Sequence, residues 1–556
     1  MPLRTGCDAQ VTGLISSPLS AAEVQTYHDT GVWRDQTIYD IVNTHAVARP
    51  DAIALRSSFR AFTWAELIAE VDAFAADLAA RGVKQGETLF VGSPNRVETV
   101  IALLAASRDG YVCCPSPHRN HTVSEIAEMC TRASCAIYIH TPGHGADAEG
   151  DEILAAIGEL ASLRHIYRLP PAANNEPFAG LLHPDLPAPA DPAGNPDLVT
   201  YLAFTSGSTG RPKGVMHSDN SQLVAARGIA DAWRFGSETV TCSLSPFSHN
   251  LGCGTLWTSL VCGGEFVLHD WPRGGALLDR LDENNVTYLV GVPTHAMDFL
   301  SELDSRGISS YDQLDSFRVS AAACPEHISG ALYDLGIPVQ KGYGMTETNG
   351  HQHGLPGDSR HRVTNTSGVC CDGYELGIFD PDDPDRELPV GDPGLVAGKG
   401  GSLMLGYFQD PQATADSMNA DGWFLTGDLG TLDADGYLTL TGRRKELIVR
   451  GGHNINPNLI ESLALRHHAV DLAAAIPVPD DRLGERACLA LMFEQGTSPA
   501  IAEILGHLAA EGLSRYDMPE FWLPVADIPL MPNGKLDKIE IQRRIGAGEL
   551  EPLPVR

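Results

Sequence analysis

The chain has 556 residues, of which 43% are hydrophobic and 7% aromatic, so we expect a folded protein of two or three structural units. Its formal net charge of −32 excludes the nucleic-acid-binding class and argues against docking on anionic lipid, because both partners need a basic surface. The sequence has no apolar run long enough for a transmembrane helix and no signal-peptide pattern, which predicts a cytoplasmic protein.

The first part of the chain alternates between strand and helix patterns. Thr63 and Glu66 form a capping-box pattern, and the apolar stripe from Leu67 to Leu78 predicts a helix that ends at Gly82. A further helix is predicted near 97–106, and strands at 89–91, 135–140, 199–204, 239–244, 265–268, 287–292 and 317–321. This alternation predicts an α/β fold with parallel sheets.

Two later segments differ from this alternation. Residues 355–440 are rich in Gly, Asp and Pro with short alternating runs, which predicts small β-sheets. After Arg444 a compact unit of strands and helices is predicted. Asn456 is its expected N-cap and Pro457 the first residue of a helix that runs through Leu465.

The clearest chemical pattern is an apolar strand that enters a loop of glycines and hydroxyls and ends at a lysine. The loop residues are Thr205, Ser206, Gly207, Ser208, Thr209, Gly210 and Lys213. Glycines let backbone N–H groups curl around an anion, and the hydroxyls and the lysine add donors and charge, which predicts a phosphate site. The loop is not a Walker loop, because Arg211 and Pro212 separate Gly210 from Lys213. A plain Gly/Ser turn is the alternative that this segment alone leaves open.

With four further segments in the same order, this loop resembles the adenylate-forming enzymes, a family of acyl- and aryl-CoA synthetases, free-standing adenylation domains and beetle luciferases. The segments span residues 342–348, 423–428, 442–455 and 531–535, and the resemblance covers roughly residues 30–545. It implies an N-terminal domain, 1–444, of two α/β subdomains and a small β-rich subdomain at about 355–440. A mobile α+β C-terminal domain, 445–556, follows.

The resemblance also implies the roles of the nucleotide site. Tyr343 stacks on adenine, Thr346 binds the α-phosphate, and Glu347 holds Mg²⁺. A carboxylate beside a phosphate site indicates a cation between them. Asp428 accepts hydrogen bonds from the ribose hydroxyls, and Arg443 reaches the ribose or the phosphates.

Three further positions concern the second half of the reaction and the domain movement. Lys445 matches the hinge between the domains, and Gly452 matches a backbone position that lines the pantetheine tunnel of CoA ligases. Lys535 lies in a Pro-Asn-Gly turn, a sharp exposed loop that presents one lysine. In the family this lysine bridges the substrate carboxylate and the α-phosphate, where two negative groups must meet. The chain has only seven lysines, so a lysine at a motif position is informative.

The acyl pocket is implied at His249, Asn250, Gly254 and Ala322, with His249 as a gate. Amino-acid-activating relatives usually place an aspartate in this region to bind the α-amine, and this chain has none there, which weighs against an amino acid substrate. The motifs are most similar to those of ligases for medium-chain and alicyclic acids.

These patterns predict an acyl-CoA synthetase that uses ATP and Mg²⁺ to form an acyl-adenylate and then transfers the acyl group to coenzyme A. The partners are a carboxylic acid, ATP and CoA, and a homodimer is the expected assembly. Three alternatives stay open: a carrier-protein ligase, a luciferase-type oxidation, and a non-catalytic nucleotide-binding homologue. The presence of Lys535, Glu347 and Asp428 weighs against the last.

Overall fold

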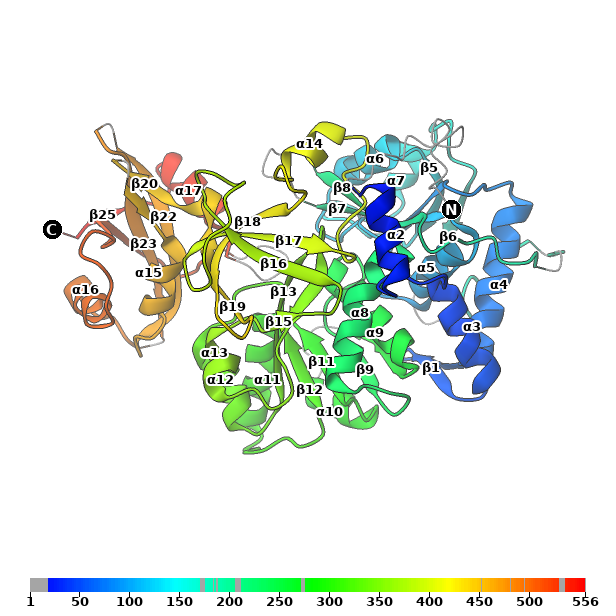
Figure 1. Ribbon diagram of the computed structural model, residues 1–556, viewed down its shortest axis with the longest axis horizontal. Helices are drawn as coiled ribbons and strands as arrows, with labels where there is room; N and C mark the ends of the chain where they lie inside the picture. Colours follow the sequence, from blue (N-terminus) through cyan, green and yellow to red (C-terminus); the bar gives the residue numbers. More distant parts are fainter. Residues whose placement is uncertain are drawn as a thin grey trace.

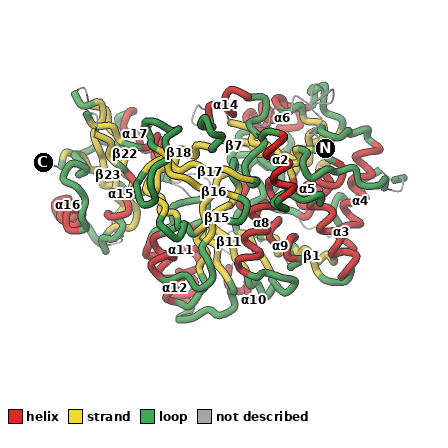
Figure 2. Tube along the Cα trace, viewed as in Figure 1, coloured by secondary structure: helices red, strands yellow, loops and turns green. Residues whose placement is uncertain are grey.

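The computed structural model describes residues 19–170, 176–183, 185–186, 189–205, 212–271, 276–451, 453–480, 482–494, 496–529 and 536–555. Within these ranges the strands form four sheets. Helices flank the nine-stranded sheet and the six-stranded sheet of the large body, so the predicted α/β class is confirmed. Figure 1 shows a large body that ends in a smaller lobe formed by the C-terminal part of the chain, and Figure 2 shows helix and strand interleaved throughout.

The largest sheet has nine strands in the order β15-β14-β13-β12-β11-β9-β10-β1-β2. Its strands are β1 (Ile53–Arg56), β2 (Ala61–Thr63), β9 (Val240–Ser243), β10 (Glu265–Leu268), β11 (Tyr288–Gly291), β12 (Ser316–Val319), β13 (Val339–Met345), β14 (Asn349–His353) and β15 (Val369–Cys370). From β1 to β13 the inner strands pair in parallel, as the alternation predicts, and an antiparallel hairpin, β13–β14, lies near one edge.

The second sheet has six strands in the order β6-β5-β3-β4-β7-β8. They are β3 (Thr88–Gly92), β4 (Val112–Cys114), β5 (Cys135–His140), β6 (His165–Arg168), β7 (Val199–Thr205) and β8 (Lys213–Ser218). Strands β7 and β8 pair antiparallel, so the chain turns back on itself at the predicted phosphate loop.

Two further sheets follow, one of four strands and one of six. One has the order β16-β17-β18-β19 and consists of β16 (Tyr374–Phe379), β17 (Gly394–Gly400), β18 (Phe424–Leu432) and β19 (Leu438–Arg443). The other consists of β20 (Ile448–Arg450), β21 (His453–Ile455), β22 (Val470–Asp480), β23 (Gly484–Phe493), β24 (Phe521–Pro524) and β25 (Leu553–Pro554). The hydrophobic clusters around this last sheet contain only residues from Ile448 onward.

The helices that begin before residue 300 are α2 (Ala21–Asp29), α3 (Ile38–Ala48), α4 (Trp64–Ala80), α5 (Val97–Asp109), α6 (Val123–Arg132), α7 (Glu152–Ile157), α8 (Asp219–Trp233), α9 (Asn250–Cys262), α10 (Leu277–Glu283) and α11 (Pro293–Ser305). They are followed by α12 (Glu326–Asp334), α13 (Arg360–Asn365), α14 (Pro411–Asp416), the 3-10 turn η1 (Arg444–Glu446), α15 (Pro457–Ala464), α16 (Ile501–Ala510) and α17 (Lys538–Gly546). No helix in the described ranges has the length and apolar character needed to cross a bilayer.

Helix α4 illustrates why the local patterns are reliable. The Thr63 hydroxyl accepts a hydrogen bond from the Glu66 backbone N–H at 3.2 Å, and the Glu66 carboxylate accepts one from the Thr63 N–H at 2.9 Å. The predicted capping box is therefore confirmed. The stripe Leu67, Val71 and Leu78 is fully buried, which fixes the helix against the core.

Candidate active site

The described residues line one large cavity of about 3240 Å³. A pocket for a single small ligand usually has about 300–1,000 Å³, so this cavity includes the groove between the large body and the C-terminal lobe. Lys213 and Asp428 line it from the large body, and Leu536 and Lys538 line it from the lobe. A site here is therefore built by both parts of the chain.

The two ends of the predicted phosphate loop lie at this cavity. Thr205 and Lys213 are directly paired across strands β7 and β8, and the Thr205 hydroxyl donates to the Lys213 carbonyl at 3.5 Å. Both residues line the cavity. Ser206, Gly207, Ser208, Thr209 and Gly210 lie outside the described residues. The antiparallel pairing brings the two ends of the loop together at the cavity wall.

Glu347 lies in the β13–β14 turn and is half-buried. Its carboxylate accepts a hydrogen bond from the Tyr407 hydroxyl at 2.8 Å, and the Lys213 ammonium lies 4.5 Å from the centre of the Tyr407 ring. Burial raises the pKa of Glu347, and the Tyr407 hydrogen bond and the Lys213 charge offset this only in part. A carboxylate of this kind would gain from a bound cation.

Glu347 fits the chemistry of Mg²⁺, which is often held by one or two carboxylates together with phosphate oxygens and water. In the described part of the chain, no group of three or more His, Cys, Asp or Glu side chains could hold a metal ion. Mg²⁺ held here would accordingly depend on the nucleotide for most of its ligands.

A hydrogen bond from a histidine fixes the backbone of Thr346. The His217 Nε2 donates to the Thr346 carbonyl at 2.7 Å, and its Nδ1 lies 3.0 Å from the Ser221 hydroxyl. Burial lowers the pKa of His217 to about 4, so the ring is neutral at neutral pH. The backbone of the β13–β14 turn is therefore fixed, and Thr346 lines the cavity.

Asp428 connects two of the predicted nucleotide residues. The Tyr343 hydroxyl donates to Asp428 Oδ2 at 2.6 Å, and Arg443 Nε donates to Oδ1 at 2.9 Å. All three residues line the cavity. The structure thus brings together Tyr343, Asp428 and Arg443, which lie as much as 100 residues apart in sequence.

The predicted acyl-pocket residues also share this cavity. They are His249, Asn250, Gly254 and Ala322. The His249 ring lies 4.4 Å from that of His118, centre to centre, and burial lowers the pKa of His118 to about 3. Asn250 donates to the Asn349 side-chain oxygen at 3.2 Å, which ties the start of α9 to β14.

The described residues next to Lys535 line the cavity, whereas those next to Gly452 do not. Lys535 and Gly452 themselves lie outside the described residues. The residues that follow Lys535, namely Leu536, Asp537 and Lys538, line the cavity, as does Lys445 in η1. The neighbours of Gly452, namely Gly451 and His453, are not among the residues that line it.

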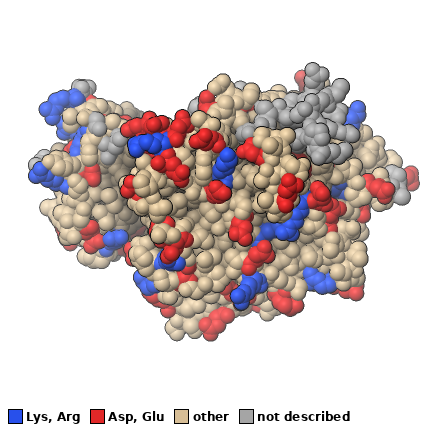
Figure 3. Space-filling model, in the orientation of Figure 1, with Lys and Arg blue, Asp and Glu red and all other residues tan. Residues whose placement is uncertain are grey.

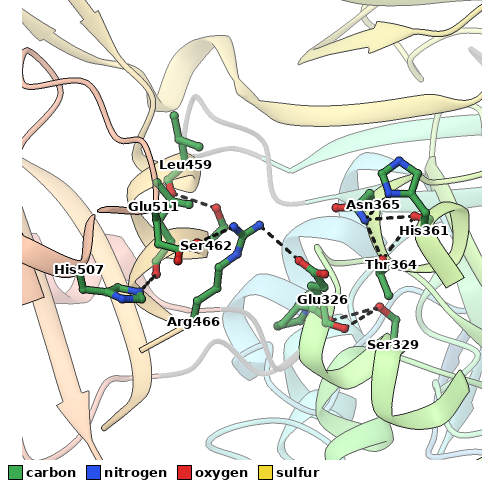
Figure 4. Close-up of polar contacts among 12 residues, drawn as sticks. Glu326, Ser329, His361, Thr364, Asn365, Leu459, Ser462, Arg466, His507 and Glu511 are labelled. Atoms are coloured by element: carbon green, nitrogen blue, oxygen red, sulfur yellow. Dashed lines mark hydrogen bonds and ion pairs between the residues drawn. The ribbon is translucent and has the colours of Figure 1, made fainter. Parts of the chain in front are cut away.

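Polar contacts hold the lobe beside the large body. The Arg466 guanidinium lies 3.3 Å from the Glu326 carboxylate of α12 and 2.9 Å from Glu511 of its own lobe, as Figure 4 shows. The Asn456 side chain donates to the Thr441 carbonyl of β19. These contacts are partly solvent-exposed, so each contributes little to the free energy of association.

The sequence interpretation missed Tyr407, His217 and His118. Each contacts a motif residue only through the fold, and none has a recognisable spacing to its partner. The isolated bridge between Val215 and Tyr407 brings residue 407 beside strand β8, which explains how Tyr407 reaches Glu347.

Two family models match the two parts of the chain that line the cavity. The family model described as AMP-binding enzyme matches residues 42–408, and the one described as AMP-binding enzyme C-terminal domain matches residues 459–535. The chain is 32% identical over 511 residues to 3-[(3aS,4S,7aS)-7a-methyl-1,5-dioxo-octahydro-1H-inden-4-yl]propanoyl:CoA ligase of Mycobacterium tuberculosis (strain ATCC 25618 / H37Rv), which covers 89% of this chain and 96% of that one.

Two other similarities span almost the whole chain. The medium-chain fatty-acid–CoA ligase of Escherichia coli (strain K12) is 26% identical over 525 residues, covering 93% of this chain and 92% of that protein. Among solved structures, ATP-bound MatB from Rhodopseudomonas palustris superposes with a TM-score of 0.82 at 25% identity and covers 92% of this chain and 99% of its own.

Proposed function

Because the chain belongs to the AMP-binding enzyme family and is an adenylating enzyme of the acyl-CoA synthetase type, we propose that it activates a medium-chain or alicyclic acid for transfer to CoA. ATP supplies the adenylyl group in the first step, and the CoA thiol accepts the acyl group in the second.

One observation carries this proposal. Lys213, Thr346, Glu347, Asp428 and Arg443 come from four separate motifs and line one cavity with the residues that follow Lys535. This shared lining supports a triphosphate site beside a pocket for an acid.

In the proposed first step, a carboxylate oxygen of the acid attacks the α-phosphorus, and pyrophosphate leaves. Lys213 and Lys535 offset the negative charge that gathers as these groups meet, while Thr346 binds an α-phosphate oxygen. Tyr343 and Asp428 orient the nucleoside. Mg²⁺ held by Glu347 would neutralise charge on the phosphates.

In the second step, the thiolate of CoA attacks the acyl carbonyl carbon, and AMP leaves. One cavity must admit first the nucleotide and then the thiol, so we expect the C-terminal lobe to turn about Lys445 between the steps. The residues that follow Lys535 line the cavity and the neighbours of Gly452 do not, which supports assigning the present arrangement to the first step.

The test is pyrophosphate release over a panel of carboxylic acids, measured with CoA, with a phosphopantetheinyl carrier protein, and with neither. Acid-dependent release and acyl-CoA formation are expected. Thioester formation on the carrier protein alone would favour the carrier-protein ligase, and the absence of acid-dependent release would contradict adenylation.

Lys535→Ala separates the two steps. Adenylation should fall on the order of 10²–10³-fold, because one charge-assisted contact made in the transition state is lost. A chemically supplied acyl-adenylate should still be converted to acyl-CoA at a near-normal rate. Loss of this second step with intact adenylation would show that the assignment is wrong.

The domain boundary at 444/445, the homodimer and the cytoplasmic location stay predictions. Limited proteolysis near Lys445 tests the first, and sedimentation velocity tests the second.

A further inference from the structure

A polar cluster lies on the face of the nine-stranded sheet toward α8 and α9. Leu289, Phe317 and Val339 pack into the core under α10, α11 and α12. Side chains alternate along a strand, so their neighbours Tyr288, Arg318 and Gln340 point to the opposite face. Tyr288 packs there with Ile229 of α8 and Leu251 of α9.

These three side chains are joined by hydrogen bonds. The Tyr288 hydroxyl and Arg318 Nη1 both donate to Gln340 Oε1, at 2.9 and 3.0 Å. Arg318 Nη2 donates to the carbonyls of Gly350 and Gln352, at 3.2 and 3.1 Å. Every one of these acceptors is electrically neutral.

Arg318 is consequently a buried charge for which the described residues provide no counter-ion. Its side chain is 2% exposed, and among the described residues no Asp or Glu forms an ion pair with it. Burial lowers the pKa of Arg318, yet a guanidinium remains protonated in proteins. A buried cation is costly unless an anion pairs with it.

The cluster also has more donors than acceptors. Gln340 Nε2 is buried and has no hydrogen-bond partner in the described part of the chain, while Gln340 Oε1 already accepts two hydrogen bonds. Because Arg318 lines the cavity and Gln340 does not, an additional group there that accepts hydrogen bonds and carries negative charge would offset the charge of Arg318.

The cluster borders the acyl pocket. Tyr288 and Arg318 line the same cavity as Asn250 and Gly254, and α8 contributes Gln222, Ala225, Ala226 and Ile229. A Cβ added at Gly254 would meet no atom within 4 Å, so the pocket is open beside it.

Two glycines leave room for the guanidinium next to the β13–β14 hairpin. A Cβ built at Gly342 would lie 2.5 Å from Arg318 Nη2, and one built at Gly350 would lie 3.0 Å from it. Both glycines line the cavity. The positive charge therefore lies directly beneath the hairpin that carries Tyr343 and Thr346.

We propose that the acid carries a second carboxylate at its far end and that Arg318, which lines the cavity, binds this group. This inference rests on the proposed function, because it names the substrate class of the same acyl pocket. A hydrocarbon tail would leave the guanidinium buried and unpaired, whereas a carboxylate forms charge-assisted hydrogen bonds with it.

The first test uses the wild-type enzyme and needs no variant. Pyrophosphate release is measured with adipate, pimelate and suberate, and with hexanoate, heptanoate and octanoate as matched monoacids. We expect kcat/KM to favour the best diacid over its matched monoacid on the order of a hundredfold. A kcat/KM for monoacids equal to or higher than that for diacids would overturn the inference while leaving adenylation intact. The absence of acid-dependent pyrophosphate release across the whole panel would contradict both proposals.

A methyl-ketone acid of the same length tests the need for charge. It offers an oxygen acceptor without a negative charge, so it should rank below the diacid. Equal kcat/KM for the methyl-ketone acid and the diacid would overturn the inference that the substrate carries a second carboxylate.

Variants then assign the preference to a residue. Arg318→Met removes the charge at similar length and should reduce the diacid-to-monoacid ratio to about one. Arg168→Met changes an exposed arginine paired with Asp151 and should leave the ratio as in the wild type. A folded Arg318→Met enzyme with an unchanged ratio would mean that Arg318 only supports the hairpin. If that variant does not fold, the wild-type panel still decides.

Discussion

Tyr407 offers a selective way to perturb the proposed metal site. Its hydroxyl donates to the Glu347 carboxylate at 2.8 Å, while its ring contacts the Lys213 ammonium. Tyr407→Phe removes the hydroxyl and keeps the ring, so the cation–π contact with Lys213 should persist. The variant therefore changes one hydrogen bond to one carboxylate.

The expected effect follows from the environment of Glu347. A hydrogen bond to a charged group contributes about 1.5–3 kcal/mol, and burial already disfavours the ionised form of this carboxyl. If ionised Glu347 holds Mg²⁺ during adenylation, the rate should fall on the order of 10- to 100-fold. The assay is pyrophosphate release at saturating acid and ATP over a range of Mg²⁺ concentrations, and the half-maximal concentration should rise.

A matched control is Tyr39→Phe. The Tyr39 hydroxyl donates to Asp72 at the same 2.8 Å, but neither residue is among those that line the cavity. This variant should retain wild-type adenylation. Wild-type rate and Mg²⁺ dependence in Tyr407→Phe would refute the role assigned to the Tyr407–Glu347 contact.

Three further outcomes are expected. Burial lowers the pKa of His217 to about 4 and that of His118, His351 and His353 to about 3. As the pH falls, the unfolded chain therefore protonates these histidines at a higher pH than the folded protein does. The stabilisation that the neutral imidazoles provide is complete above pH 6.5 and is lost as the pH falls toward 4. The free energy of unfolding should fall by up to about 5 kcal/mol per pH unit there, and a melting temperature that is constant from about pH 7 to 5 would contradict this. Gly254→Ala should stabilise α9 by about 1 kcal/mol in chemical denaturation and lower kcat/KM for bulky acids, since the added methyl enters open space. Arg466→Ala removes an exposed contact to Glu326 of at most about 1 kcal/mol, so single-turnover adenylation should slow less than about fivefold; a larger loss would indicate a tighter lobe contact.

Local sequence patterns predicted the elements where one short segment contains the whole signal. The Thr63–Glu66 capping box and the Asn456–Pro457 helix start both appear as predicted, because the groups that satisfy the first turn lie within a few residues of each other. Seven strands of the two large α/β sheets, β3, β5, β7, β9, β10, β11 and β12, were equally visible as apolar runs, whereas short strands such as β1, β4 and β6 were not predicted.

Contacts that depend on the tertiary fold could not be predicted in this way. Tyr407 lies 60 residues from Glu347, and no periodicity relates the two. Arg318 interrupts an apolar strand, and the sequence alone does not show that this face of the strand lies beneath α8 and α9. The antiparallel return of β8 was missed because its six residues follow directly after the phosphate loop.

The distribution of charge gives the rare lysines of this sequence a physical meaning. Red and blue side chains are interspersed over the face in Figure 3, and the chain as a whole carries 71 acidic against 39 basic residues. The described cavity lining departs from this excess, because its acidic and basic side chains are equal in number. Of the six described lysines, the four that line it are Lys213, Lys341, Lys445 and Lys538. A triphosphate and a carboxylate are repelled by a strongly acidic protein, so a cavity without net negative charge, enclosed by low-dielectric walls, is where such anions can concentrate. The scarcity of lysine elsewhere is therefore itself a signal for the site, and it is one that composition alone provides.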